Sequence, residues 1–68
     1  MDNSLEIGRV KRSEKVEIVI RTGDYMGKSY VDIREYLIGP EPYQGFTKRG
    51  IRVPVDLFPQ LVEKLQMI

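Results

Sequence analysis

The clearest alternation of apolar and polar positions in the chain lies in residues 28–38, KSYVDIREYLI, and it predicts a β-strand. This stretch is rich in β-branched and aromatic residues and has no proline, with Gly27 before it and Gly39-Pro40 after it. Because side chains alternate across a strand, one face carries Tyr30, Asp32, Arg34 and Tyr36. The other face is mostly apolar and carries Ser29, Val31, Ile33, Glu35 and Leu37.

The remaining segments predict a small antiparallel sheet followed by one helix. Strands are expected at 5–12 and 15–22, with residues 23–27 as the hairpin loop that leads into 28–38. After a proline-containing break, segments 43–49 and 51–53 complete the sheet, with Gly50 at a bend or bulge. The predicted class is α+β, with four to five antiparallel strands and a C-terminal helix in one domain over residues 1–68. Residues 1–4 are polar and expected to be disordered.

The last segment has the spacing of an amphipathic helix. Asp56 is its predicted N-cap, which puts Pro59 in the first turn, where its missing N–H does no harm. Apolar residues then recur at spacings of three and four, as Phe58, Leu61 and Leu65 show. We expect this stripe to pack on the apolar face of the sheet or to contribute to a dimer seam.

The length and composition favour a protein that is supported by a partner subunit. A 68-residue chain buries only about 60% of the surface that its unfolded form exposes, so its core is thin. There is no Cys and no His, which excludes disulfides and removes the commonest metal ligands, and we expect a homodimer. No apolar run approaches the roughly 20 residues of a membrane span, and residues 1–13 lack the apolar core of a signal peptide. A soluble, intracellular protein without a membrane partner is expected.

Charge and side-chain chemistry argue against an enzyme. Eleven basic and ten acidic residues give a net charge of +1, so bulk charge alone does not indicate a polyanion partner. Asp32 and Glu35 are three apart in a strand and point to opposite faces, so they cannot act as a catalytic pair. Asp32 is expected to pair with Arg34 or with a basic residue across the sheet. Without His, Cys or a carboxylate cluster, neither a nucleophile nor a metal finds its usual partners, and no cofactor is expected.

Aromatic and basic side chains occur together in the predicted sheet. Single-stranded nucleic acid is bound by aromatic platforms under the bases and by basic side chains along the phosphates. The alternative is that these aromatics belong to a small core or to a dimer contact, and the pattern alone leaves both interpretations open. The residues concerned are Tyr25, Tyr30, Tyr36, Tyr43 and Phe46, near Lys28, Arg34, Lys48 and Arg49.

Three short motifs carry a resemblance to a known family. They are residues 31–36 (VDIREY), residues 48–51 (KRGI) after a Gly/Pro loop, and residues 25–28 (YMGK) in the preceding hairpin. With the terminal helix, they resemble the single-strand-binding domain of the transcriptional coactivator positive cofactor four family, in its minimal bacterial or phage-like form. The resemblance covers about residues 25–65. It implies a four-stranded antiparallel sheet with a C-terminal helix, dimerised so that two curved sheets form grooves for unpaired DNA.

The resemblance also implies roles for individual residues. Tyr25 would be a stacking platform, and Lys28 and Arg34 would contact phosphates or bases. Leu37 stands where the family often has a stacking tryptophan, and Tyr43 is the candidate to restore an aromatic surface. The implied binding residues are Tyr25, Lys28, Arg34, Tyr36, Leu37, Tyr43, Lys48 and Arg49. Those implied for the core or the dimer interface are Phe58, Leu61 and Leu65.

These inferences predict a homodimeric single-stranded DNA-binding protein in a DNA-containing compartment. It would act at open DNA, in transcription regulation or in replication and repair, with the transcription or replication machinery as a further candidate partner. One alternative is an RNA-binding protein of the same fold. Another is a protein-interaction module whose basic face is incidental.

Overall fold

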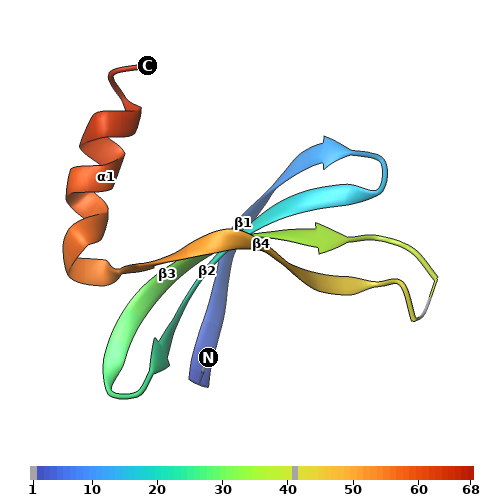
Figure 1. Ribbon diagram of the computed structural model, residues 1–68, viewed down its shortest axis with the longest axis horizontal. Helices are drawn as coiled ribbons and strands as arrows, with labels where there is room; N and C mark the ends of the chain where they lie inside the picture. Colours follow the sequence, from blue (N-terminus) through green and yellow to red (C-terminus); the bar gives the residue numbers. More distant parts are fainter. Residues whose placement is uncertain (1, 41) are drawn as a thin grey trace.

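Four strands form one antiparallel sheet in which neighbours in sequence are also neighbours in space (Figure 1). The computed structural model describes residues 2–40 and 42–68. The strands are β1 (Asp2–Ser13), β2 (Val16–Tyr25), β3 (Lys28–Leu37) and β4 (Gly45–Pro54). A 3-10 helix, η1 (Val55–Leu57), leads into the helix α1 (Phe58–Leu65). The predicted α+β class is confirmed, with four strands rather than five.

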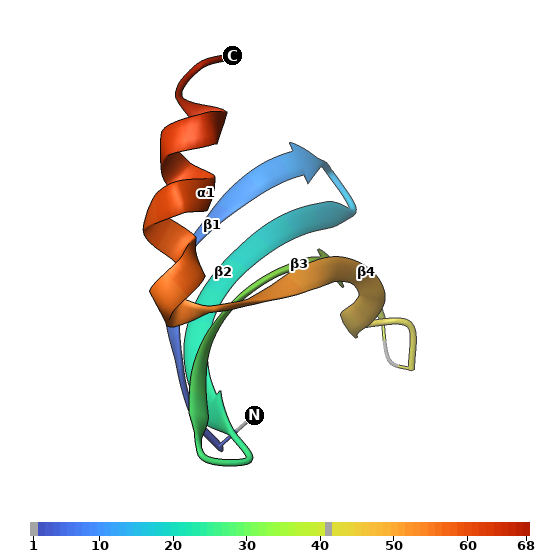
Figure 2. The ribbon, with the colours of Figure 1, turned by 60° about the vertical axis from the view of Figure 1, so that its left-hand side comes forward.

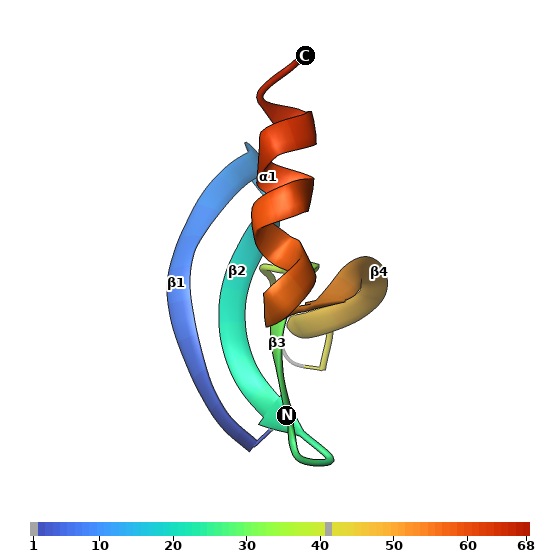
Figure 3. The same ribbon diagram turned by 90° about the vertical axis from the view of Figure 1, so that its left-hand side faces the viewer.

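The first strand begins earlier than expected. β1 starts at Asp2, so residues 2–4, expected to be disordered, belong to the sheet, while Met1 lies outside the described residues. The register between β1 and β2 shifts at three places. Such irregularities bend a strand and increase its twist. Figures 2 and 3 show β1 and β2 bent into arcs along their length.

The hairpin between β2 and β3 is tighter than predicted. β2 continues to Tyr25, and only Met26 and Gly27 connect it to Lys28, in place of the expected loop over 23–27. Both linking residues have positive φ, 51° and 80°, as in the two-residue turns that match the twist of paired strands. Gly27 takes this conformation without strain, whereas in Met26 it brings the Cβ close to the following carbonyl oxygen. The tight turn pairs Tyr25 with Lys28 and gives β2 and β3 an unbroken register.

Gly50 lies inside β4, at a bulge. The register between β3 and β4 shifts between Arg34 and Tyr36, close to where Gly50 pairs with Arg34. Gly50 has φ 154°, and a Cβ there would lie 2.3 Å from the carbonyl oxygen of Ile33 and 2.7 Å from the Cα of Arg34. Only glycine allows two backbones to approach this closely. The predicted bend or bulge at Gly50 is confirmed, within one strand rather than between two.

The register divides the sheet into two faces, because residues opposite one another in antiparallel strands share a face. This confirms the alternation predicted for residues 28–38. The apolar face includes Ile18, Ile20, Val31, Ile33, Glu35, Leu37, Ile51 and Val53. The opposite face includes Arg9, Glu17, Val19, Arg21, Tyr25, Lys28, Asp32, Arg34, Tyr36, Phe46 and Arg52.

The deepest burial occurs on the second of these faces. Val19 and Asp32 are both fully buried there, whereas on the apolar face Ile33 is half-buried and Ile51 is 51% exposed. Val31 is the buried residue of the apolar face. Side chains from neighbouring strands converge over Asp32, as they do on the inner side of a bent sheet, so we call this the concave face. In the single chain the apolar face is therefore less buried than the concave face, apart from Val31.

The C-terminal helix projects away from the sheet (Figure 1). The predicted N-cap role of Asp56 is wrong, because Asp56 lies within η1 and no side chain caps α1, although Pro59 does lie in the first turn. No residue of α1 is buried: Phe58 and Leu61 are half-buried and Leu65 is exposed. Packing of this stripe at a dimer seam stays a prediction. Neither α1 nor any other helix in the described part of the chain has the length and apolar character needed to cross a membrane.

Candidate nucleic-acid interface

A buried carboxylate organises the centre of the concave face. Asp32 of β3 accepts a hydrogen bond from Nε of Arg21 at 3.1 Å and one from Nη2 of Arg34 at 3.0 Å. The Nε of Arg52 lies 3.8 Å from the same carboxylate. A buried charge requires such pairing, because its desolvation is costly. The predicted pairing of Asp32 with Arg34 is confirmed, and two cross-strand arginines join it.

These contacts control the protonation of Asp32. Burial by itself would raise the pKa of the Asp32 carboxyl, but hydrogen bonds from Arg34 and Arg21 outweigh it and hold the pKa below its ordinary value. The hydrogen bond to Asp32 likewise raises the pKa of Arg34. At neutral pH one negative charge therefore stands among three positive ones, and the centre of the concave face carries a positive excess.

Three aromatic rings of the concave face each lie against an arginine. A guanidinium within about 6 Å of a ring centroid is attracted by the negative face of the ring. Two of these rings, Tyr36 and Phe46, also pack edge to face with centroids 4.9 Å apart. The basic and aromatic side chains thus interleave instead of forming separate patches. The pairs, measured from Cζ to the centroid, are Arg9 over Tyr36 at 4.8 Å, Arg21 over Phe46 at 3.9 Å and Arg52 over Tyr25 at 5.3 Å.

The β1 side of the concave face is balanced in charge. Arg9 donates to Glu6 at 2.8 Å through Nε and to Glu17 at 3.0 Å through Nη1. These hydrogen bonds, that to Glu6 above all, raise the pKa of Arg9, and the one from Arg9 lowers the pKa of Glu6. The positive excess of this face therefore lies over β2, β3 and β4, around Asp32.

Four of the predicted binding residues share the concave face. Tyr25 and Lys28 face each other at the hairpin, where both are exposed. Arg34 is half-buried and donates through Nη1 to the carbonyl of Thr47 at 3.3 Å, in addition to its bonds to Asp32. Tyr36 is the fourth, and its ring is half-buried beside Phe46.

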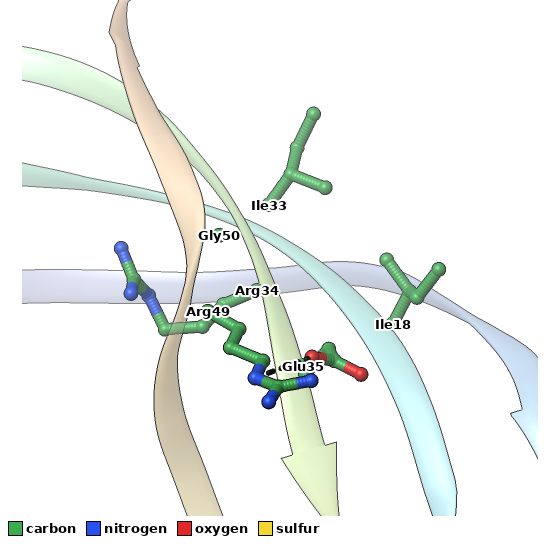
Figure 4. Close-up of a pocket in the computed structure, with 6 residues that line it drawn as sticks. All are labelled: Ile18, Ile33, Arg34, Glu35, Arg49 and Gly50. Carbon is green, nitrogen blue, oxygen red and sulfur yellow. Dashed lines mark ion pairs between the residues drawn. The ribbon is translucent and has the colours of Figure 1, made fainter.

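The other predicted binding residues lie apart from this group. Leu37 alternates to the apolar face, where it lines a hollow of about 270 Å³ with Tyr43. Arg49 turns toward Glu35, with 3.9 Å between Nε and Oε2. Figure 4 shows this pair beside a hollow over the isoleucines of the apolar face, while Arg34 extends in another direction. Lys48 is exposed on β4. A binding role for these residues stays a prediction.

Three arginines of the concave face were not among the predicted binding residues, and Phe46 was named only as one of the aromatic candidates. The position of Arg21 could have been predicted from the sequence. A two-residue turn at Met26 and Gly27 sets the register of β2 against β3 and puts Arg21 opposite Asp32. Arg52 cannot be placed in this way, since its register depends on the bulge at Gly50. The three arginines are Arg9, Arg21 and Arg52, and Arg21 lies over the ring of Phe46.

Comparison with known proteins gives one informative match. No protein-family model matches the sequence, and no curated protein matches it. Among solved structures, the chain is similar to the crystal structure of a PC4 homolog from Burkholderia pseudomallei, with a TM-score of 0.82 and 26% sequence identity over 96% of each chain. The chain has a PC4-like fold. The predicted resemblance to the positive cofactor four family is thereby confirmed.

The PC4-like fold gives each of the three sequence motifs a place in the structure. Residues 25–28 form the turn between β2 and β3, and residues 31–36 form the centre of β3. Residues 48–51 lie in the bulged part of β4. The motifs therefore mark the turn, the central strand and the bulge that together set which side chains reach the concave face.

Proposed function

We propose that this chain is a homodimeric single-stranded DNA-binding protein that acts where DNA strands are open, in transcription regulation or in replication and repair. The observation that carries the proposal is the concave face, where arginines around Asp32 interleave with Tyr25, Tyr36 and Phe46 on a PC4-like fold. Guanidinium groups bind phosphate through paired hydrogen bonds, and both guanidinium planes and aromatic rings stack on bases. The protein would reside in a DNA-containing compartment.

The geometry favours a single strand over a duplex. Stacking requires an open base face, which an unpaired strand offers and a duplex hides. Tyr25 is 48% exposed at the tip of the hairpin, and Lys28 lies opposite it, so a ring and a cation are presented together. A strand that stacks on Tyr25 can therefore place a phosphate near Lys28 and continue along the concave face toward Arg34.

The accessible surface supports the homodimer. The chain of 7.9 kDa exposes 5443 Å², whereas a monomeric protein of this mass exposes about 4,400 Å². The excess of roughly 1,000 Å² is close to the roughly 800 Å² that one partner buries in a standard interface. Exposed apolar side chains supply such an area, among them Ile51, Leu57 and Leu65. We place the seam on the apolar face and α1, with Phe58, Leu61 and Leu65 as contacts.

Competition binding tests the proposal directly. Labelled oligo-dT is displaced by unlabelled oligo-dT, by duplex DNA and by single-stranded RNA, at two salt concentrations. We expect unlabelled oligo-dT to compete best and its log affinity to fall by about 0.7 per unit of log salt for each phosphate contact. Lys64→Ala, which removes a positive charge from α1, is the matched control and should bind as the wild type does.

Each contrary result points to a different class of protein. Preference for RNA over oligo-dT would show that this fold binds RNA here. Equal affinity for duplex and oligo-dT would contradict stacking. Absence of binding to all three would leave the protein-interaction module as the function.

A further inference from the structure

Each of the three arginines around Asp32 places its Nε nearest, or close to, the carboxylate, although only Arg21 and Arg34 hydrogen-bond to it. The carboxylate accepts from Nε of Arg21 at 3.1 Å and from Nε of Arg34 at 3.2 Å, and Nε of Arg52 is its third neighbour at 3.8 Å. Nε is the inner donor of a guanidinium, and the two Nη groups form the outer edge. Within residues 2–40 and 42–68, the Nη groups of Arg21 and Arg52 donate no hydrogen bond to another residue. Arg34 differs, because its Nη groups bond to Asp32 and Thr47.

Two of the guanidinium groups near Asp32 also lie over aromatic rings. Arg21 lies over the ring of Phe46 at 3.9 Å, and Arg52 lies over the ring of Tyr25 at 5.3 Å. Each guanidinium therefore lies over a ring, while Nε of Arg21 donates to the carboxylate and Nε of Arg52 lies 3.8 Å from it. The remaining donors of Arg21 and Arg52 are free for a ligand. A long arginine side chain without these two restraints would sample many rotamers.

We propose that Asp32 is a positioning residue for the bound strand: its carboxylate hydrogen-bonds Nε of Arg21 and attracts the nearby Nε of Arg52, so that the Nη edges of both arginines contact phosphate. The faces of the two guanidinium groups then extend the stacking surface of Phe46 and Tyr25. This inference rests on the proposed function of the concave face. It explains why the negatively charged Asp32 lies at the centre of a surface that binds a polyanion.

The proposal predicts an effect opposite in sign to simple electrostatics. Asp32→Asn removes a negative charge from the binding face, which by charge alone would tighten binding of oligo-dT. If Asp32 positions the arginines, the same change weakens binding by about tenfold or more, because the oriented contacts of Arg21 and Arg52 are lost. Glu6→Gln is the matched control, since it removes a negative charge from β1 on the rim of the same face. It should leave binding unchanged or tighter.

NMR of the free protein shows whether Asp32→Asn affects the orientation of the arginines or the folding of the chain. In the wild type, the Nε–Hε groups of Arg21 and Arg34 should give slowly exchanging signals, because both donate hydrogen bonds to Asp32. In Asp32→Asn these signals should broaden or vanish while the backbone amide spectrum is kept. Arg52→Lys keeps the charge but has no Nε donor in a plane, and it should weaken binding several-fold with little change in melting temperature.

The outcomes distinguish this inference from the proposed function. If the wild type binds oligo-dT and Asp32→Asn binds it equally or more tightly, the positioning role is refuted and the proposed function stands. Where Asp32→Asn fails to fold, Arg52→Lys decides, and wild-type affinity in that variant refutes the inference. A wild type that binds no oligo-dT refutes the proposed function and the inference together.

Discussion

The two faces of the sheet differ in a way that reverses the usual relation between polarity and burial. On the concave face, the charged Asp32 is fully buried beside Val19, under arginines from three strands. On the apolar face, Ile51 is 51% exposed and Ile33 is half-buried. Arginines cover Asp32 on the concave face, whereas the pairing of Glu35 with Arg12 and Arg49 on the apolar face leaves Ile51 exposed.

This difference suggests a different role for each face. The concave face is complete within one chain, and its positive excess and its rings suit a charged ligand that carries planar groups. The apolar face carries exposed apolar side chains such as Ile51, and an extended apolar surface is typical of an interface. In our account the concave face binds the DNA strand, and the apolar face binds a second copy of the chain.

Substitution of Gly50 should have the largest effect on stability. The close approach of β4 to β3 at Gly50 sets the register of β4, and the side chains of both faces depend on this register. Gly50→Ala would put a Cβ 2.3 Å from the carbonyl oxygen of Ile33, and the backbone cannot yield at that point. We expect a loss of about 4 kcal/mol or more in the free energy of unfolding, enough to unfold most of the protein. Urea denaturation measures it. Gly8→Ala is the control, since nothing lies within 4 Å of its Cβ, and wild-type stability in both variants would refute the close approach.

The second prediction is that acid lowers the stability of the protein by protonating Asp32 on the concave face. The pKa of Asp32 is lowered in the folded protein, so its contribution to stability is full above the unfolded pKa, which is about 3.9. This contribution is lost as the pH falls through the lower, folded value. Protonation weakens the hydrogen bonds that Arg21 and Arg34 donate to Asp32, and we therefore expect the free energy of unfolding to fall. Denaturation at pH 7 and at pH 2 should show a smaller difference for Asp32→Asn than for the wild type, and equal differences would contradict the role of Asp32.

A charged residue introduced on the apolar face tests whether this face forms the dimer seam. Ile51→Glu exposes its carboxylate in a single chain but buries it at the proposed seam, where an unpaired charge is costly. We expect the dissociation constant of the dimer to rise roughly 100-fold, equal to about 2.8 kcal/mol. Sedimentation equilibrium gives this constant, with Met26→Glu at the exposed hairpin tip as the control. A wild-type protein that is monomeric at micromolar concentration would refute the seam.

Stacking at the hairpin should give the smallest effect. Tyr25→Ala removes an exposed ring, so we expect an affinity loss of about 1–3 kcal/mol for oligo-dT with a nearly unchanged salt slope. Lys28→Ala is the matched comparison, because it removes a charge at the paired position and should lower the slope by about 0.7. A Tyr25→Ala defect that disappears once unfolded protein is discounted would contradict stacking.

The sequence predicted those parts of the fold that local patterns determine. The alternation in 28–38 identified β3 and its two faces, and the glycine at 50 indicated the bulge. Met26 obscured the tight turn, because a residue other than Gly, Asn or Asp seldom takes positive φ there. A five-residue loop in its place shifts the register of β2 against β3, so that Arg21 no longer lies opposite Asp32.

Other parts of the structure depend on contacts that no local pattern contains. Arg52 reaches Asp32 only because the bulge sets the register of β4. The burial of Val19 and Asp32 results from the curvature of the whole sheet. The spacing of apolar residues correctly predicted an amphipathic helix, but it does not show which surface packs against the apolar side of α1.

The most direct test of the account is an NMR titration of the labelled protein with oligo-dT, because it reports on both faces at once. We predict that amide and arginine side-chain signals shift on the concave face, at Arg21, Asp32 and Arg34, and at Tyr25 of the hairpin. Signals of Ile33 and Ile51 on the apolar face should stay nearly unchanged. Shifts centred on the apolar face, or spread equally over both faces, would contradict the claim that the concave face binds the strand.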